Sequence, residues 1–162
     1  MNIVIGNIIA LIASLLMVYT GVLKNKKRII CLQTIQIGFF VISNLFLKGF
    51  SGAIVNAVSM FRNILSYKGL LKLKEKIIIT VITIILVLLF NNYGVIGLLP
   101  LISMISYIWL MNINDIKKFK ILIIFTMLLW LIYDFFIKSY TSTIFDFFTI
   151  IANLITLFKL KK

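Results

Sequence analysis

The sequence predicts an all-α integral membrane protein whose seven transmembrane helices form two parallel three-helix repeats joined by a linker helix. Three observations predict this fold: an apolar composition, an alternation of basic connections, and a repeat at a spacing of 90 residues. Apolar residues make up 62% of the chain, and only four acids occur. Such a chain cannot cover itself with a water-soluble surface. Because a helix needs about 20 apolar residues to cross a hydrocarbon core of roughly 30 Å, spans should use nearly all of residues 1–162, a single transmembrane domain.

Apolar runs separated by charged clusters predict the spans in order. They cover residues 3–22, 29–47, 52–68, 77–93, 95–112, 119–137 and 141–158. The first should be retained as a span, because no basic segment precedes it and no small-residue cleavage site follows at signal-peptide distance. Cys31 is the only cysteine and histidine is absent. We therefore expect no disulfide framework, no metal site and no cofactor.

The connections between spans alternate between strongly basic and nearly neutral. Basic residues follow spans one, three, five and seven: Lys24, Lys26, Lys27 and Arg28; Lys68, Lys72, Lys74 and Lys76; Lys117, Lys118 and Lys120; Lys159, Lys161 and Lys162. Only Lys48 and Lys138 lie in the remaining connections. Because basic connections stay in the cytoplasm, the N-terminus is expected outside and the C-terminus inside. The charge of +13 then faces anionic lipid headgroups of the bilayer, and no nucleic-acid partner is expected.

A shift by 90 positions superimposes the two halves of the chain without a gap. "SNLFLKGFSGAIVNAVSMFRN" (43–63) then lies on "YDFFIKSYTSTIFDFFTIIAN" (133–153). Polar matches carry the argument, because polar residues are few within the spans: Lys48 with Lys138, Ser51 with Thr141, Asn56 with Asp146, Ser59 with Thr149, and Asn63 with Asn153. We expect a first repeat in residues 1–68, a linker helix in 77–93 and a second repeat in 95–162. A single linker span gives both repeats the same orientation in the membrane.

The repeated polar residues share one helical face. Asn56, Ser59 and Asn63 are spaced i, i+3 and i+7, and the second repeat has the same spacing in Asp146, Thr149 and Asn153. Lipid offers them no hydrogen-bond partner, so both faces should turn inward. The sequence predicts a polar chamber between spans three and seven. Asn63 should face Asn153 across it, with Asn56 and Asp146 as a second tier nearer the outside.

Spans two and six add further residues to this chamber, namely Gln33, Gln36, Phe40 and Asn44, and Thr126, Trp130 and Asp134. The predicted substrate-binding residues are Asn56, Ser59, Asn63, Trp130, Asp146, Thr149 and Asn153. Ser59 and Thr149 could equally join helices to one another, at about 0.6 kcal/mol each. Trp130 and Tyr133 could equally be packing residues. Asp134 lies near the outer end of its span, and we interpret it as a rim residue.

Arg62 lies within an otherwise apolar span. A charge at the centre of a span costs several kcal/mol, so it requires a partner or a purpose. It precedes Lys68 by six residues, roughly 9 Å of helix rise, and could extend to the inner boundary. Alternatively, its guanidinium closes the inner end of the chamber as a gate. Its partner there would be a backbone carbonyl, a polar side chain of span two or six, or Asp146, and the second repeat has Ala152 at the matching position.

Two segments resemble a known family. The chain opens with "GNIIALIASLLMVYTGVLKNKK" and continues through "LQTIQIGFFVISNLFLKGFSGAIVNAVSMFRN", which is similar to the bacterial inner-membrane YgjV family, most clearly from Gly6 to Asn63. The three, one and three arrangement also resembles the SWEET and PQ-loop (MtN3-like) superfamily, which includes sugar facilitators and the transporter PnuC. The resemblance implies the bacterial inner (cytoplasmic) membrane and a transport fold. In contrast to that superfamily, Pro100 is the only proline and no Pro-Gln dipeptide occurs.

Enzyme activity is not expected, because the chain has no histidine, paired acidic motif, cysteine cluster or glycine-rich phosphate loop. No catalytic residue is assigned. Amides and hydroxyls beside an aromatic wall suit a sugar-like or nucleoside-like solute, which predicts a transporter or facilitator for a small polar solute. The alternative is a non-transporting binding or signalling component that works with a partner protein. A homo-oligomer is compatible with either function.

Overall fold

The computed structural model describes residues 2–160, which are all-helical apart from connections. The elements are α1 (Asn2–Val22), α2 (Lys26–Phe46), α3 (Phe50–Tyr67), α4 (Leu73–Phe90), the 3-10 turn η1 (Ile96–Leu98), α5 (Leu99–Leu110), α6 (Ile116–Phe136) and α7 (Tyr140–Lys159). Each predicted span holds one α-helix, with η1 and α5 together in the fifth. The all-α prediction is confirmed.

Three helices begin three or four residues before the predicted spans, at Lys26, Leu73 and Ile116. Local capping explains two of these starts. The Asn25 side chain accepts a hydrogen bond from the Arg28 backbone N–H at 3.2 Å, and Asp115 accepts one from the Lys117 N–H at 2.7 Å. These caps satisfy free backbone donors of the first turn. Lysine is also a good helix former, so a charge that ends an apolar run does not end the helix.

Four helices, α1, α2, α6 and α7, are long and apolar enough to cross a membrane. The segment Ile96–Leu110 is apolar but shorter. Large apolar side chains are exposed along the outer faces of the helices, Leu88, Leu89 and Phe158 among them. An exposed apolar surface of this extent is typical of a protein that faces lipid.

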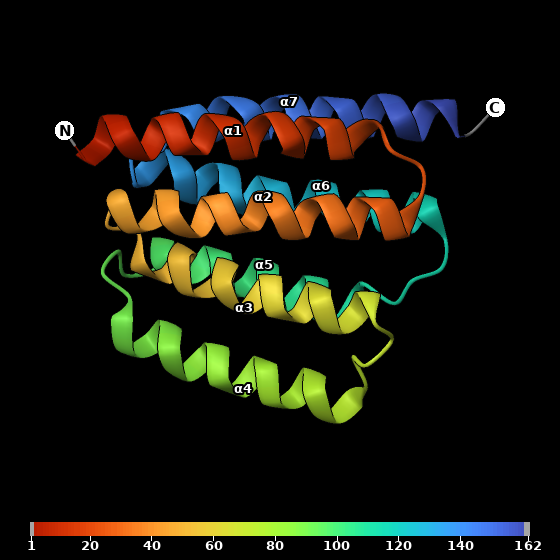
Figure 1. Cartoon of the computed structure of the whole chain (residues 1–162), viewed down its shortest axis with the longest axis horizontal. Coiled ribbons are helices and arrows are strands. Elements are labelled where there is room, and N and C mark those ends of the chain that lie inside the picture. The colour runs from red at the N-terminus through yellow and green to blue at the C-terminus, as the bar shows by residue number, and fades with distance from the viewer. Residues whose placement is uncertain (1, 161–162) are drawn as a thin grey trace.

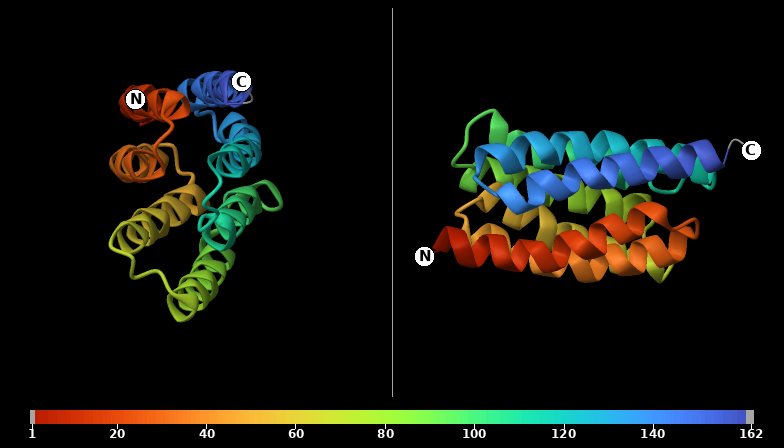
Figure 2. Two further views of the ribbon diagram at one scale, coloured as in Figure 1. Left: turned by 90° about the vertical axis from the view of Figure 1, so that its right-hand side faces the viewer. Right: turned by 90° about the horizontal axis from the view of Figure 1, so that it is seen from above.

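The helices run roughly parallel to one another (Figure 1). Six of them form a ring in which each packs on the next, in the order α1, α2, α3, α5, α6, α7 and back to α1. Seen end on, the ring has two rows, α1 to α3 and α7 to α5, while α4 packs outside it on α3 and α5 (Figure 2). Helices α1 and α5, α2 and α6, and α3 and α7 therefore occupy opposite positions in the ring.

The two ends of the bundle carry very different charge. The N-terminal end, where the described chain starts, holds the α2–α3 and α6–α7 connections with Lys48 and Lys138 (Figure 1). At the C-terminal end lie the α1–α2, α3–α4 and α5–α6 connections, whose flanks carry the other lysines of the connections. The predicted alternation of basic connections thus corresponds to two physical ends of one bundle.

The α2–α3 and α6–α7 turns have the same geometry. Lys48 and Lys138 adopt left-handed backbone angles, with φ of 58° and 62°. In the first turn the Gly49 N–H donates to the Asn44 carbonyl at 2.9 Å, and in the second the Ser139 N–H donates to the Asp134 carbonyl at 2.9 Å. Each helix therefore ends in a Schellman motif, with a lysine where glycine is usual.

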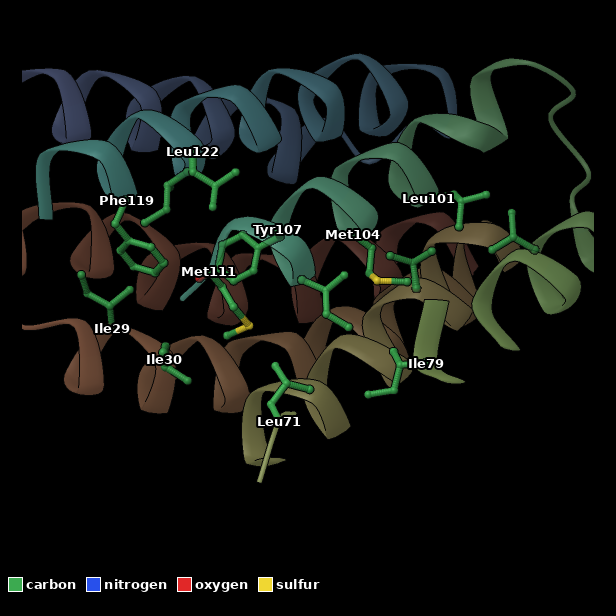
Figure 3. Packing of buried hydrophobic residues seen from close by; sticks show 14 residues of the cluster. Ile29, Ile30, Leu71, Ile79, Leu101, Met104, Tyr107, Met111, Phe119 and Leu122 are labelled. Carbon is green, nitrogen blue, oxygen red and sulfur yellow. The ribbon is translucent and has the colours of Figure 1, made fainter. Parts of the chain in front are cut away.

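Helix α1 approaches its neighbours closely through glycines. A Cβ added to Gly6 would lie 2.8 Å from Leu47 Cγ of the α2 end, and one added to Gly21 would lie 2.9 Å from Ala152 Cβ of α7. Small residues permit such approach between helices in lipid. A hydrophobic cluster joins α4 to the ring helices, and within it Tyr107 of α5 and Met111, which follows α5, pack near Phe119 of α6 (Figure 3).

Candidate functional site

A polar cavity of about 70 Å³ lies between the six ring helices. One water molecule requires roughly 10–15 Å³ by this measure, so the cavity has room for several. Its aromatic lining is Phe40, Tyr107 and Trp130, and its polar lining includes Gln33, Gln36, Ser59 and Thr126. The Gln36 Oε1 atom is buried and accepts no hydrogen bond from the described residues. An unpaired buried acceptor is costly, so the cavity is suited to a polar guest.

Four side chains at matching positions of the two halves line this cavity: Asn44 of α2, Asn56 of α3, Asp134 of α6 and Asp146 of α7. We call them the polar quartet. Each is at most 6% exposed. Asparagine in the first half faces the same space as aspartate in the second. The sequence interpretation placed Asp134 at the rim, which is wrong, because its side chain lies on the cavity side of α6 and is 5% exposed.

The two acids of the quartet lie on adjacent helices. Asp134 of α6 and Asp146 of α7 line the same cavity, and the two helices pack on each other. Among the described residues, no N–H or O–H group donates to Asp146 Oδ2, which is buried. Within residues 2–160, neither acid forms an ion pair with a basic residue. Asp146 therefore faces the cavity and its neighbouring acid rather than a cation.

Arg62 lines the C-terminal part of the cavity and is 3% exposed. Its Nε and Nη2 groups donate to Asn63 Oδ1 at 3.1 and 2.8 Å. The guanidinium stacks on the Tyr107 ring, 4.5 Å from the centroid, and the Tyr107 hydroxyl donates to Gln33 Oε1 at 2.7 Å. This chain of contacts joins α3, α5 and α2. No ion pair between Arg62 and Asp146 forms.

Three predicted substrate-binding residues do not line the cavity. Asn63, Thr149 and Asn153 are all buried within the bundle. The Asn153 Nδ2 group donates to the Thr149 backbone carbonyl at 2.8 Å, while Asn63 accepts from Arg62. The other four, Asn56, Ser59, Trp130 and Asp146, share the cavity wall with Arg62, the predicted gate residue.

A hydrophobic plug separates the cavity from the N-terminal end. It consists of Leu47, Tyr133 and Ile137, all nearly inaccessible, with Tyr93 packed on them. The Tyr133 hydroxyl accepts a hydrogen bond from the Gly52 backbone N–H at 3.0 Å, and its ring meets the Trp130 ring edge to face at 5.7 Å. Beyond the plug a groove of about 520 Å³ opens between Lys48 and Lys138.

Two lysines tie the halves together at the C-terminal end. Lys120 of α6 is fully buried and donates to the Gly21 carbonyl at 2.7 Å and the Thr20 carbonyl at 3.2 Å, at the end of α1. Lys26 of α2 donates to the Ile113 carbonyl in the α5–α6 connection at 3.0 Å. Cations suit the carbonyl end of a helix. Sequence reasoning missed these roles, because both lysines were counted with the solvent-facing connections.

The comparison with known proteins gives one result. A family model named Imp-YgjV, described as a bacterial inner membrane protein, matches residues 4–162. No curated protein and no solved structure matches the chain.

Proposed function

Because the chain belongs to the Imp-YgjV family of bacterial inner membrane proteins, we propose that it transports a small polar solute through the centre of its helix ring. The observation that carries this proposal is the polar cavity between the ring helices, lined by the polar quartet and Arg62. Polar side chains are expensive in a membrane unless they face water, one another or a ligand.

The architecture behind this function is two parallel three-helix repeats, α1 to α3 and α5 to α7, linked by α4. Three features support it: the opposite positions of corresponding helices in the ring, the matching Schellman motifs at Lys48 and Lys138, and the matching positions of the quartet. The charge difference between the two ends supports an outside N-terminus.

In a chain with Cys31→Ser, a cysteine introduced by Asn25→Cys should resist an impermeant thiol reagent added outside the cell. Labelling of this cysteine would contradict the orientation.

The solute class follows from the chemistry of the cavity wall. Amides of Asn44 and Asn56 offer donors and acceptors, and Trp130 and Tyr107 offer ring faces, which together suit a sugar-like or nucleoside-like molecule. The plug at the N-terminal end and the cluster around Arg62 and Tyr107 at the other would act as outer and inner gates. A solute larger than a few water molecules would enter only when one gate opens.

Uptake by reconstituted vesicles tests the proposal. A panel of radiolabelled sugars and nucleosides would be offered to the wild type, to Asn56→Leu in the cavity and to Phe61→Leu, whose side chain is 56% exposed on the same helix. We expect uptake of at least one panel member, lost in Asn56→Leu and kept in Phe61→Leu. Absence of uptake, together with a protein that copurifies stoichiometrically, would favour a binding or signalling component instead.

A further inference from the structure

Asp134 and Asp146 are two buried acids beside one cavity. They are 5% and 2% exposed and line the cavity from adjacent helices. Two bare carboxylates at this place inside a membrane would repel each other and would lack hydration. A carboxylate only accepts hydrogen bonds, so the two carboxyl groups can bond to each other only if one of them is protonated.

In the described part of the chain, no lysine or arginine is paired with either acid in place of a proton. The ionisable groups that face the pair from neighbouring elements are Tyr133 on α6, Tyr93 in the connection before η1, Arg62 on α3 and Tyr107 on α5. Arg62 follows Asn56, the quartet member on its helix, by six residues, roughly 9 Å of helix rise, and its donors are directed to Asn63. Helices α1 and α2 add only neutral residues to the cavity lining.

The first half of the chain supplies a natural comparison. Asn44 and Asn56 occupy the positions that match Asp134 and Asp146, and they line the same cavity. Amide and carboxyl side chains have nearly the same shape, but only the carboxyl can release a proton. The second half therefore differs from the first by two exchangeable sites beside a space large enough for water, and Gln36 adds an amide to the wall of that space.

We propose that Asp134 and Asp146 form one proton-binding site that opens on the cavity, and that their shared proton is the coupling ion of transport. The role of this proton in transport rests on the function proposed above. An O–H bond forms when the pair takes a proton from the outer side, and it breaks when the proton leaves to the inner side. Release leaves two carboxylates whose repulsion separates α6 from α7 around the cavity.

Infrared spectroscopy of the purified protein in a detergent without carbonyl groups tests the proton site without any solute. A protonated carboxyl has a C=O stretching band that a carboxylate lacks. The chain has only four acidic side chains, and the other two, Glu75 and Asp115, lie at helix N-termini. At about pH 7 we expect the band of one carboxyl per chain, unchanged in the control Glu75→Gln/Asp115→Asn.

The single variants Asp134→Asn and Asp146→Asn should each lose the whole band, because the new amide donates to the remaining carboxylate. If the two acids were protonated independently, the wild type would show twice this band and each single variant would keep half of it. If neither acid were protonated, the wild type would show no band. Either result would overturn the shared proton.

Vesicle uptake of a panel solute tests the coupling separately. An acidic exterior should raise the initial rate several-fold in the wild type and leave it unchanged in Asp134→Asn/Asp146→Asn. Uptake that ignores the pH gradient in the wild type would overturn the coupling, whatever the infrared result. If no panel solute enters, the proposed transport fails with its coupling, while the infrared result decides the proton site.

Discussion

Replacement of Arg62 by lysine distinguishes a gate from an anchor. Lysine keeps the charge but offers one donor to Asn63 Oδ1 where Arg62 offers two, at 3.1 and 2.8 Å. A hydrogen bond from a charged group contributes about 1.5–3 kcal/mol. Lysine also loses the flat stack on Tyr107, 4.5 Å from the ring centroid, which contributes about 1–2 kcal/mol when buried. We expect the free energy of unfolding to fall by about 2–4 kcal/mol, allowing for incomplete additivity.

The assay pairs reversible unfolding in mixed micelles with uptake by vesicles. The chain has one other arginine, Arg28, which is exposed on the first turn of α2. Arg28→Lys is therefore the matched control, and its effect on unfolding should stay within about 0.5 kcal/mol. If the Arg62→Lys change raises the free-energy barrier of the rate-limiting transport step by about 1.4 kcal/mol, the initial uptake rate falls about tenfold.

A double-mutant cycle with Tyr107→Leu isolates the stack. The coupling energy between Arg62→Lys and Tyr107→Leu should be about 1–2 kcal/mol, because each change removes the same contact. Wild-type stability and uptake in Arg62→Lys would refute the gate reasoning. Arg62 would then be a cation that lysine can replace.

Three further predictions concern how the bundle is held together. Gly21→Val should lower the free energy of unfolding, measured by chemical denaturation, by about 1–3 kcal/mol, because a Cβ at this position meets α7. Its control is Gly38→Ala, which should be nearly neutral in the same assay because the nearest neighbour of the new Cβ would be 3.7 Å away. Lys120→Met should lower stability by about 1–3 kcal/mol in that assay because the α1 carbonyls lose a buried donor, whereas the exposed Lys118→Met should not. Tyr133→Phe removes the acceptor of the Gly52 N–H and should both lower stability by about 1–3 kcal/mol and raise passive leak through the outer plug, measured as dye efflux from vesicles. A neutral result in any of these would contradict the corresponding contact.

Hydropathy and charge predicted the helices well, since both are properties of single residues that a membrane reads directly. They located the helix starts less well, because Asn25 and Asp115 cap helices that begin inside charged segments. Helical spacing identified Asn56 and Asp146, and its charge within an apolar span identified Arg62; all three line the cavity. Helical spacing does not distinguish buried residues that reach the cavity from buried residues on the same face that do not. The prediction therefore grouped Asn63 and Asn153 with the cavity-lining residues.

The contacts that were missed join residues far apart in sequence. Tyr107 was hidden in a span that looks uniformly apolar, and its partners Arg62 and Gln33 are on two other helices. Asp134 was judged by its distance from the end of the span, whereas its place on the cavity side of α6 decides its burial. Side-chain direction depends on how helices are rotated about their axes, and the weak amphipathicity of α2 and α6 leaves that rotation undetermined in the sequence.

The contact of α1 with α7 has a consequence for biogenesis. These helices close the ring, and the Thr156 hydroxyl donates to the Gly21 carbonyl across 135 positions of sequence at 3.1 Å. During synthesis, α1 cannot complete its packing until α7 has been inserted. Until then, Asp134 and the end of α1 lack the neighbouring residues that bury them. Such long-range closure is slow, and incomplete chains expose surfaces that invite misassembly. A nascent chain arrested before Tyr140 should thus be a preferred substrate for membrane quality-control proteases.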